Sequence, residues 1–440
     1  IMSTFTCIKH VRLLVGDGRE AIQDGVLVLE NGDTPEQDSL RYCGSFENFH
    51  PDFAEGASVA ELDLSCGEYT ILPGLINTHA HLDLELPYLP YYLDKWGDAY
   101  RALVVYRRAS EALRCGVTTI RGVGIVGQTE LAVRNAFKKG LLWGPRIVSC
   151  GSPLVPHAGH GFATPGSVQC SGADEFVRGL RGQLAQGVDQ IKLMYTGGLA
   201  GANEGTMDVQ MTEAEVAACV EVAHSNSKKI SAHLSNDHAI AQAVRLGMDG
   251  IEHGYTISEE TAQLMAEKNV FYTPTLCVSH CNDYMRKLGV PDYTLIKQEA
   301  AANAHISSCR RAVEAGVTIC TGTDLLPSDP IGGTTPTIRE TELLVEDVGL
   351  SPLEAIKAAT YNGARLCGVD KITGTLEAGK CGDFIIVEGK PDEDIHDLRN
   401  LRLVSRGCRL VWSELPVFTK DNFKILPPGV SCTGGVFKRW

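Results

Sequence analysis

Two histidines at the end of an apolar run are the residues of this chain best placed to do chemistry. The segment 73–81 reads PGLINTHAH, so one alanine separates His79 from His81. Residues two apart in an extended strand point to the same face, and both imidazoles can therefore reach one metal ion. An HxH pair also arises by chance, so a metal site needs further ligands elsewhere in the chain.

Four later β-rich runs also end on polar side chains that could face a common site. They are Lys192 in IKLMYTGG, His233 in SAH, His253 in IEHG and Asp324 in TGTD. Taken singly, such a lysine is usually ion-paired, such a histidine is usually a buried core residue, and such an aspartate can cap a helix. Together, at the ends of four runs, they favour one shared metal site.

The elements that would position these residues are short strands alternating with helical segments, the pattern of a parallel sheet wrapped by helices. Capping-box spacing marks two of the helix starts, at Thr212 and Ser351. Eight strands close a (β/α)8 TIM barrel, whose active site lies at the carboxyl ends of the strands. We therefore predict an α/β fold with a catalytic barrel over 71–371. The predicted strands are 71–81, 117–123, 146–154, 190–196, 229–234, 250–253, 271–276 and 317–324.

The two ends of the chain have a different pattern, in which short β-rich runs are separated by turns. The run at 26–29 leads into the turn-forming ENGD, and GDFIIV at 382–387 begins a matching set near the other end. We predict that 1–70 and 372–440 pair into one small β-sandwich domain. The tail after Glu414 is predicted to be an irregular wrap or an interface arm.

The charge balance and the cysteines limit the kinds of partner and compartment. The 40 Lys and Arg against 54 Asp and Glu give a formal net charge of −14, which repels phosphate backbones and anionic membranes. We expect a small-molecule substrate and no nucleic-acid or membrane partner. The 15 cysteines are scattered, which favours reduced thiols and a cytoplasmic location. We see no signal-peptide or transmembrane pattern.

The ordered combination of these motifs resembles the amidohydrolase superfamily over nearly the whole chain, as far as GTLEAGKCGD at 374–383. It is most similar to the dipeptidase, ochratoxinase and imidazolonepropionase-like group, whose binuclear members carry this Ile-Lys strand. The resemblance implies two divalent ions, with zinc the expected ion, and a carboxylated lysine. It implies the following ligands: His79, His81 and Asp324 on the more buried ion, His233 and His253 on the more exposed ion, and Lys192 bridging both.

This ligand set makes chemical sense. An ammonium would repel a cation, whereas the carbamate formed on Lys192 would offer two oxygen donors. Two close divalent ions acidify a bridging water and so supply hydroxide for attack on a carbonyl. Asp324 would take the proton of that water and pass it to the leaving nitrogen.

Several other residues are candidates for binding or polarising the substrate. In dipeptidase-like relatives a histidine at the place of His160 polarises the scissile carbonyl, although it could also be a loop histidine bonded to backbone. His157, in the same PHAGHG segment, is a weaker candidate. Tyr195 could bind a substrate carboxylate or simply pack in the barrel. Arg121 could pair with a substrate carboxylate or with an acid behind the metal ligands.

The chain departs from its relatives at two places, Gly122 where they often have Asp and Ser235 where they often have His. These changes put in doubt the support of the ligands and the shape of the substrate pocket. Aromatic residues at 88, 91, 92 and 96 could fold over the site, form an oligomer contact or only pack.

We expect hydrolysis of an amide or peptide bond in an N-acyl amino acid or dipeptide-like molecule. A cyclic amidase, deaminase or decarboxylase acting on a heterocyclic or aromatic acid is the alternative, since one scaffold hosts all of these. A noncatalytic assembly protein is a third reading, which the intact ligand set disfavours. The resemblance also implies a homo-oligomer.

Overall fold

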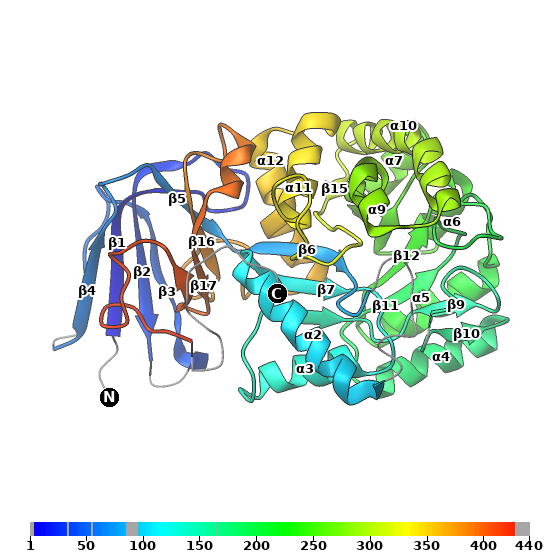
Figure 1. The fold of residues 1–440 in the computed structure, drawn as a ribbon, viewed down its shortest axis with the longest axis horizontal. Coiled ribbons are helices and arrows are strands. Elements are labelled where there is room, and N and C mark those ends of the chain that lie inside the picture. Colours follow the sequence, from blue (N-terminus) through cyan, green and yellow to red (C-terminus); the bar gives the residue numbers. More distant parts are fainter. Residues whose placement is uncertain (1–3, 33–34, 54–55, 85–95, 165, 427–440) are drawn as a thin grey trace.

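The computed structural model describes residues 4–32, 35–53, 56–84, 96–164 and 166–426. In Figure 1 a small β unit lies beside a larger unit in which helices surround strands. Both ends of the described part of the chain belong to the small unit, and its middle forms the larger one.

The small unit is one sheet with the strand order β18-β17-β16-β5-β1-β2-β3, with β4 pairing alongside β1. β16 runs antiparallel to β5, and this pairing joins the two ends of the chain. The predicted small β-sandwich domain is therefore formed by a single continuous sheet around a shared core. The strands are β1 Thr4–Leu13, β2 Ile22–Asn31, β3 Ser39–Ser45, β4 Ser58–Asp63, β5 Tyr69–Pro73, β16 Phe384–Glu388, β17 Leu401–Arg406 and β18 Arg409–Ser413.

Strand β16 ties the two units together because both of its faces are apolar. Phe384 and Ile386 belong to the core of the small unit, whereas Ile385 and Val387 belong to the core of the barrel. This alternation follows from the two-residue period of a strand. The domain limits at 70 and 372 stay a prediction, since β5 and β6 follow each other with only Gly74 between them.

The larger unit is the predicted (β/α)8 barrel, and that prediction is confirmed. Its strands pair in parallel from β6 to β8 and from β11 to β15. Two hydrogen bonds join these two groups of strands into a ring. Thr78 N of β6 donates to Thr321 O after β15 at 2.9 Å, and Asp189 N before β11 donates to Ser149 O of β8 at 2.8 Å. The barrel strands are β6 Leu75–Ala80, β7 Val117–Gly122, β8 Arg146–Ser149, β11 Ile191–Met194, β12 Ile230–Leu234, β13 Gly250–His253, β14 Phe271–Thr273 and β15 Thr318–Ile319. β9 Leu154–Pro156 pairs with β11, and β10 Val168–Cys170 pairs with β9.

Helices cover the outside of the barrel. The two predicted capping boxes are present, at Thr212 with Glu215 and at Ser351 with Glu354. The helices are α2 Gly97–Arg114, α3 Thr129–Lys138, α4 Ala173–Ala185, α5 Glu213–Ser225, α6 Asp237–Arg245, α7 Glu259–Glu267, α8 Leu276–His280, α9 Asn282–Leu288, α10 Asp292–Glu314, α11 Pro336–Leu343, α12 Pro352–Lys357 and α13 Gly363–Cys367. Four short turns complete the set, η1 Pro35–Gln37, η2 Leu344–Val348, η3 Ala358–Asn362 and η4 Ile395–Arg399.

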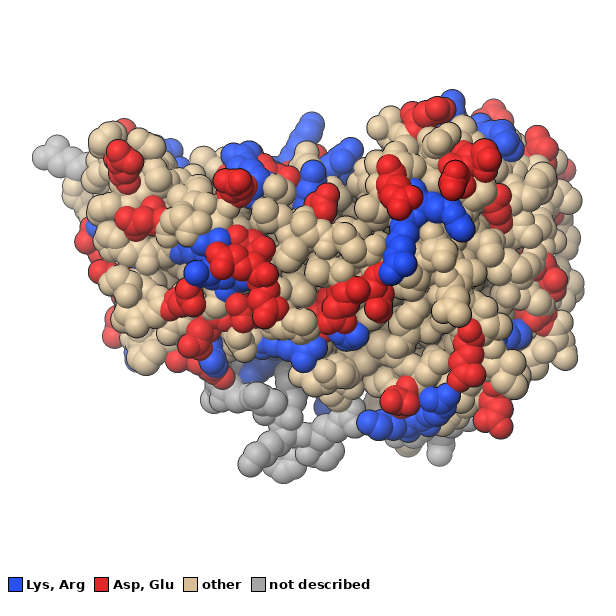
Figure 2. Space-filling view, turned by 90° about the horizontal axis from the view of Figure 1, so that it is seen from above, with Lys and Arg blue, Asp and Glu red and all other residues tan. Residues whose placement is uncertain are grey.

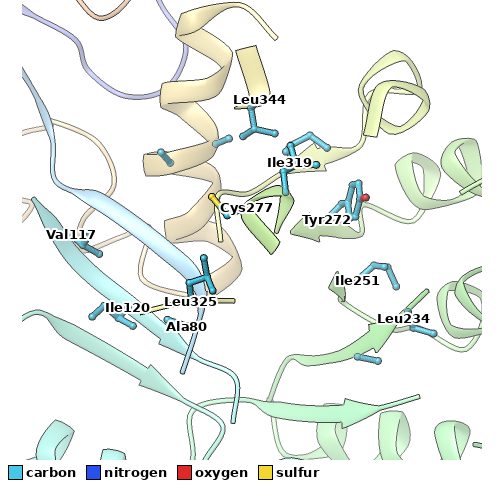
Figure 3. Close-up of a cluster of buried hydrophobic side chains, with 14 of the residues drawn as sticks. Ala80, Val117, Ile120, Leu234, Ile251, Tyr272, Cys277, Ile319, Leu325 and Leu344 are labelled. Carbon is cyan, nitrogen blue, oxygen red and sulfur yellow. The ribbon is translucent and has the colours of Figure 1, made fainter. Parts of the chain in front are cut away.

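The barrel strands sort their side chains between two environments. Outward-facing apolar residues such as Ile120, Ile251 and Ile319 join the core between strands and helices, part of which Figure 3 shows. On β12, Ala232 belongs to this core, and its neighbours in sequence therefore face the barrel interior. The same strand that builds the core thus presents His233 to the site.

The cysteines that the structure describes are all free, and many are buried. Burial raises the pKa of the Cys150 and Cys309 thiols to about 12. Such thiols are protonated at neutral pH and are poor nucleophiles.

Residues 415–426 of the tail lie against the small sheet, where Leu410 N donates to Lys424 O at 2.7 Å and Phe423 is buried. Its remaining residues lie outside the described part of the chain. Figure 2 shows acidic and basic side chains interspersed over the upper face of the molecule. Among the described helices, none is both long and apolar enough to cross a membrane.

Candidate metal centre

The carboxyl ends of the barrel strands bring the predicted metal ligands together. His79 Nε2 lies 3.3 Å and His81 Nε2 lies 2.9 Å from Asp324 Oδ1. These three side chains form one of two groups in the described chain whose ligand atoms all lie within 4.8 Å of one another. The arrangement is therefore compact enough to hold one ion.

The other predicted histidines continue from this group as a row of rings. The centroid of His253 lies 4.9 Å from that of His79 and 4.4 Å from that of His233. His160 comes next, with its centroid 4.4 Å from that of His233. Residues from four separate parts of the barrel thus meet at one place.

Hydrogen bonds fix which nitrogen of each ligand histidine is free. His79 Nδ1 bonds to the Glu252 carboxylate at 2.8 Å, and His81 Nδ1 bonds to the carbonyl of Gly124 at 2.8 Å. Both partners can only accept, so each Nδ1 carries a hydrogen and each Nε2 is left with its lone pair in the neutral ring. Both free nitrogens face Asp324, itself an acceptor.

The next two histidines are oriented in the same way. Thr275 Oγ1 donates to Pro274 O, so it accepts from His253 Nδ1 at 2.7 Å and leaves Nε2 of His253 free. His233 Nε2 donates to the carbonyl of Gly197 at 3.0 Å, which leaves Nδ1 of His233 free. Backbone and hydroxyl groups therefore select the tautomer that a metal requires.

The donor set fits a divalent cation. Imidazole lone pairs and a carboxylate oxygen converge, and none of these atoms carries a hydrogen to share with the others. Only added protons or a cation can satisfy such a group of acceptors. Nitrogen with carboxylate oxygen is a ligand combination that suits zinc. Burial raises the pKa of Asp324, but when His79 and His81 are protonated they outweigh that effect and hold this pKa well below its ordinary value.

Lys192 lies buried on β11, opposite Ser231 of β12 in register, and the next inward-facing pair is Met194 with His233. Its side chain makes no hydrogen bond or ion pair with any residue that the structure describes. Burial lowers the pKa of its ammonium, partly offset by Glu252 and Asp324. An amine so placed, with no anionic contact to fix it, is suited to modification.

His160 stands at the open end of the row on a firmly held loop. Its Nδ1 bonds to Glu204 Oε1 at 2.7 Å, and its backbone N donates to Gln210 Oε1 at 2.7 Å. Lys297 of α10 donates to the carbonyls of Gly201 at 2.5 Å and of Glu204 at 2.6 Å. The imidazole is thus oriented by an acid that is itself held by α10.

A model of the amidohydrolase family matches residues 70–427, which is most of the chain. The chain belongs to the amidohydrolase family. It is therefore a hydrolase of carbon–nitrogen bonds, as the resemblance implied. Ochratoxinase from Aspergillus niger is 32% identical over 351 residues, covering 74% of this chain and 71% of the relative.

Solved structures agree with this assignment. The crystal structure of A. niger ochratoxinase superposes with a TM-score of 0.79 and 26% identity, covering 93% of this chain and 96% of that one. A Xaa-Pro dipeptidase with bound methionine in its active site gives a TM-score of 0.79 and 25% identity, covering 92% of this chain and 98% of that one. The barrel and the small β unit are thus a shared architecture.

Inside the barrel of this amidohydrolase, Arg121 supports the ligands. It is buried and donates to Glu252 Oε1 at 2.8 Å and to Ser231 Oγ at 2.7 Å, while the other oxygen of Glu252 holds His79. Gln190 accepts from its Nε. Of the two roles expected for Arg121, the geometry corresponds to pairing with an acid behind the metal ligands.

The Arg121 pair yields a prediction of stability. Arg121→Met should lower the free energy of unfolding by about 3–5 kcal/mol, because Glu252 would be left as a buried, unpaired charge. Urea unfolding of the metal-free protein measures the effect. Arg402→Met is the control, since its partners Glu388 and Glu414 are exposed and the loss should stay below about 1 kcal/mol. Equal losses in the two variants would contradict the prediction.

Backbone geometry also holds the ligands in place. His253 and Asp324 have the positive φ angles of 69° and 54° that side chains rarely adopt. Tyr272 Oη and His305 Nε2 both bond to the carbonyl of His253, at 2.7 and 2.8 Å. Strained residues of this kind persist where the surroundings fix them, as they do at functional sites.

Gly198 makes room for the His160 ring. A Cβ on this glycine would lie 2.2 Å from Cε1 of His160. Gly198→Ala should displace the imidazole and lower kcat by about 10²-fold, the effect of a misplacement of about 1 Å. Gly182→Ala is the control, because a Cβ there meets nothing within 4 Å. Steady-state kinetics with thermal unfolding separate the outcomes, and unchanged kcat in Gly198→Ala would contradict this role.

The other two candidate substrate residues, Tyr195 and His157, have different surroundings. Tyr195 is buried in the barrel core, and its hydroxyl donates to Gln242 of α6. His157 is exposed on its loop. Trp96 is 57% exposed at the start of α2. The expected aromatic cover at Tyr88, Tyr91 and Tyr92 lies outside the described residues.

At Gly122, the first departure from the relatives, the structure shows what occupies the space of the missing side chain. A Cβ at Gly122 would lie 2.2 Å from both carboxylate oxygens of Glu130, so the glycine lets this α3 side chain reach the strand end. Burial raises the pKa of Glu130 to about 7. Ser235, the second departure, has a buried hydroxyl without a hydrogen-bond partner in the described chain.

Glu252 and Glu204 are the site residues that the sequence did not reveal. A signal existed for Glu252, since a charged residue inside the apolar run GIEH must be paired when buried. Glu204 stands in a loop without such a signal.

Proposed function

We propose that this amidohydrolase cleaves an amide or peptide bond in a small molecule of the N-acyl amino acid or dipeptide type, and that it depends on two divalent ions, with zinc the expected metal. The observation that carries this proposal is the convergence of the free His79 and His81 nitrogens on Asp324, continued by the ring row through His253 and His233. The names of the ochratoxinase and of the dipeptidase among the similar proteins are in keeping with it.

In this proposal His79, His81 and Asp324 hold one ion, and His233 and His253 hold the other. Lys192, if carboxylated on Nζ, would offer oxygen ligands to both, since it is buried on the same barrel strands and its side chain makes no hydrogen bond or ion pair with a described residue. The ions, when bound, acidify the water that attacks the substrate carbonyl.

The chain's own residues do the remaining work. Asp324 accepts the proton of the attacking water and returns it to the leaving nitrogen as the bond breaks. His160, whose Nδ1 bonds to Glu204, donates from Nε2 when protonated and so stabilises the charge that develops on the carbonyl oxygen. Glu204 positions this donor.

The test combines metal content with turnover. We expect two equivalents of metal per chain by elemental analysis, and chelator-sensitive cleavage of one or more members of a panel of dipeptides and N-acyl amino acids. One equivalent with no cleavage would favour the deaminase or decarboxylase alternative. A protein purified without metal that binds none on titration would refute the metal centre.

A small-molecule substrate, a homo-oligomeric state and a cytoplasmic location complete the proposal. The buried, free thiols are in keeping with a reducing compartment. Light scattering coupled to size exclusion measures the oligomer, and a monomer at micromolar concentration would contradict that part.

A further inference from the structure

A cavity lies at the end of the barrel opposite to the metal centre. Its volume is about 580 Å³, within the range of roughly 300–1,000 Å³ that small-molecule sites occupy. Its walls include Arg146, the first residue of β8, Gln190 just before β11 and Lys229 just before β12. These residues begin the strands, whereas His79 and His233 lie where strands end.

The walls of this cavity are basic although the chain is acidic overall. The single acidic residue in the walls, Asp189, is paired with Arg134 at 2.6 Å and with Lys138 at 3.6 Å. Asp383, behind the wall, pairs with Arg146 at 2.9 Å and Arg406 at 2.8 Å. Among the described residues, no other carboxylate forms an ion pair with the basic residues of the walls. The basic residues of the walls are Arg134, Lys138, Arg146, Lys228, Lys229 and Arg406.

Several donors in the walls are also unused. Arg406 Nε is buried and has no hydrogen-bond partner in the described chain. The side chain of Lys228 has no hydrogen bond or ion pair with a described residue. Among the described residues, Lys229 Nζ donates only to the carbonyl of Arg365, at 2.6 Å. Excess positive charge with free donors is what an anion of two or more charges requires.

The remaining wall is apolar. Trp143, Phe137, Leu366 and Val369 line it, and all except the buried Leu366 are half-buried. A bare inorganic ion would leave this surface without contact, whereas a carbon skeleton or a ring would cover it. The cavity also lies where the small β unit meets the barrel, since Gly407 of the β17–β18 turn lines it.

We propose that this cavity binds a small organic anion of at least two negative charges, either a phosphate monoester or a di- or tricarboxylate, at a site separate from the metal centre. The charged part lies against Lys228, Lys229 and Arg406, and the carbon part lies against Trp143. The proposal does not rest on the proposed reaction, since none of these residues touches the metal ligands.

Isothermal titration calorimetry on the metal-loaded, full-length protein tests it. The probes are adenosine 5′-monophosphate for the phosphate arm, citrate for the carboxylate arm, and inorganic phosphate and adenosine for the separate parts, all at matched ionic strength. We expect saturable binding of one of the two organic anions, at least about tenfold tighter than that of inorganic phosphate, and no binding of adenosine.

Variants locate the binding. The triple variant Lys138→Gln, Lys228→Gln and Lys229→Gln should weaken binding at least tenfold. Its matched control carries the same charge change at the exposed Lys268, Lys287 and Lys420 and should bind as the parent does. Should the cavity triple variant not fold, Lys228→Glu alone should give a loss of similar size. That single change is expected to fold, because the Lys228 side chain makes no hydrogen bond or ion pair with a described residue.

Three outcomes would overturn the proposal. The first is no saturable binding of either organic anion at millimolar concentration. The second is equal affinity in the cavity variants and the control variant, which would place the anion elsewhere, including at the metal centre. The third is inorganic phosphate binding as tightly as the organic anions, which would mean an adventitious ion only.

Discussion

Asp324→Asn is expected to lower kcat/KM by about 10²–10⁴-fold, the range for loss of a group that transfers protons in the transition state. Asparagine keeps the shape of the side chain and one ligand oxygen, but its amide cannot accept the proton of the attacking water. The contact of Asp324 Oδ1 with both His79 and His81 makes a weaker hold on one ion a second expected result. Steady-state kinetics and elemental analysis of the same preparation measure the two effects.

The control for Asp324→Asn is Asp283→Asn, which makes the same change on an exposed surface pair with Arg286. Its kinetics and metal content should equal those of the parent. A kcat/KM within tenfold of the parent in Asp324→Asn, with metal bound, would show that another group moves the proton. His160 is then the next residue to vary.

Lys192→Met is expected to abolish turnover and to leave at most one metal ion per chain. Methionine fills the space of the lysine stem but cannot form a carbamate, so the two ions would lose their shared ligand. The metal-free variant should be as stable as the parent or more stable, because methionine removes a buried ammonium whose side chain has no hydrogen bond or ion pair with a described residue. This combination of lost metal and retained stability separates a ligand from a structural residue.

Two further measurements make the Lys192 prediction specific. Lys229→Met, a half-buried lysine at the start of the neighbouring strand β12, should keep both metal and activity. In Lys192→Ala, added propionate should restore part of both, because its carboxylate can enter the space left by the side chain. Full metal content and full activity in Lys192→Met would exclude a bridging role.

The barrel and the convergence of the candidate ligands were readable from the sequence because strand ends carry local signals. Alternation in ISAHL at 230–234 directs His233 to the interior, and the same two-residue period joins His79 to His81. The period also explains Tyr195, which lies just after β11 and three residues after Lys192, so that its side chain points to the opposite side from that of Lys192. The candidate ligands face the interior whereas Tyr195 does not, and for this reason the substrate candidates were less predictable than the candidate metal ligands.

Other parts of the site depend on contacts between segments far apart in sequence. The carboxylate of Glu130 takes up the space that Gly122 leaves free, and no sequence pattern in either segment predicts this contact. Lys297 on α10 holds the loop of Glu204 by donating to backbone carbonyls. Every residue has a backbone carbonyl, so the loop sequence carries no signal for this contact. Such support is a property of the folded barrel, and it becomes visible only when the helices are placed around the strands.

The buried, protonated thiols affect how the protein loses its activity on heating. While the chain is folded, burial keeps thiols such as Cys150, Cys309 and Cys320 from reacting with oxidants. Unfolding would expose many of them at once, and in air they would form mismatched cross-links in competition with refolding. Heat inactivation should thus follow a rate and not an equilibrium, and a reducing agent should make it reversible.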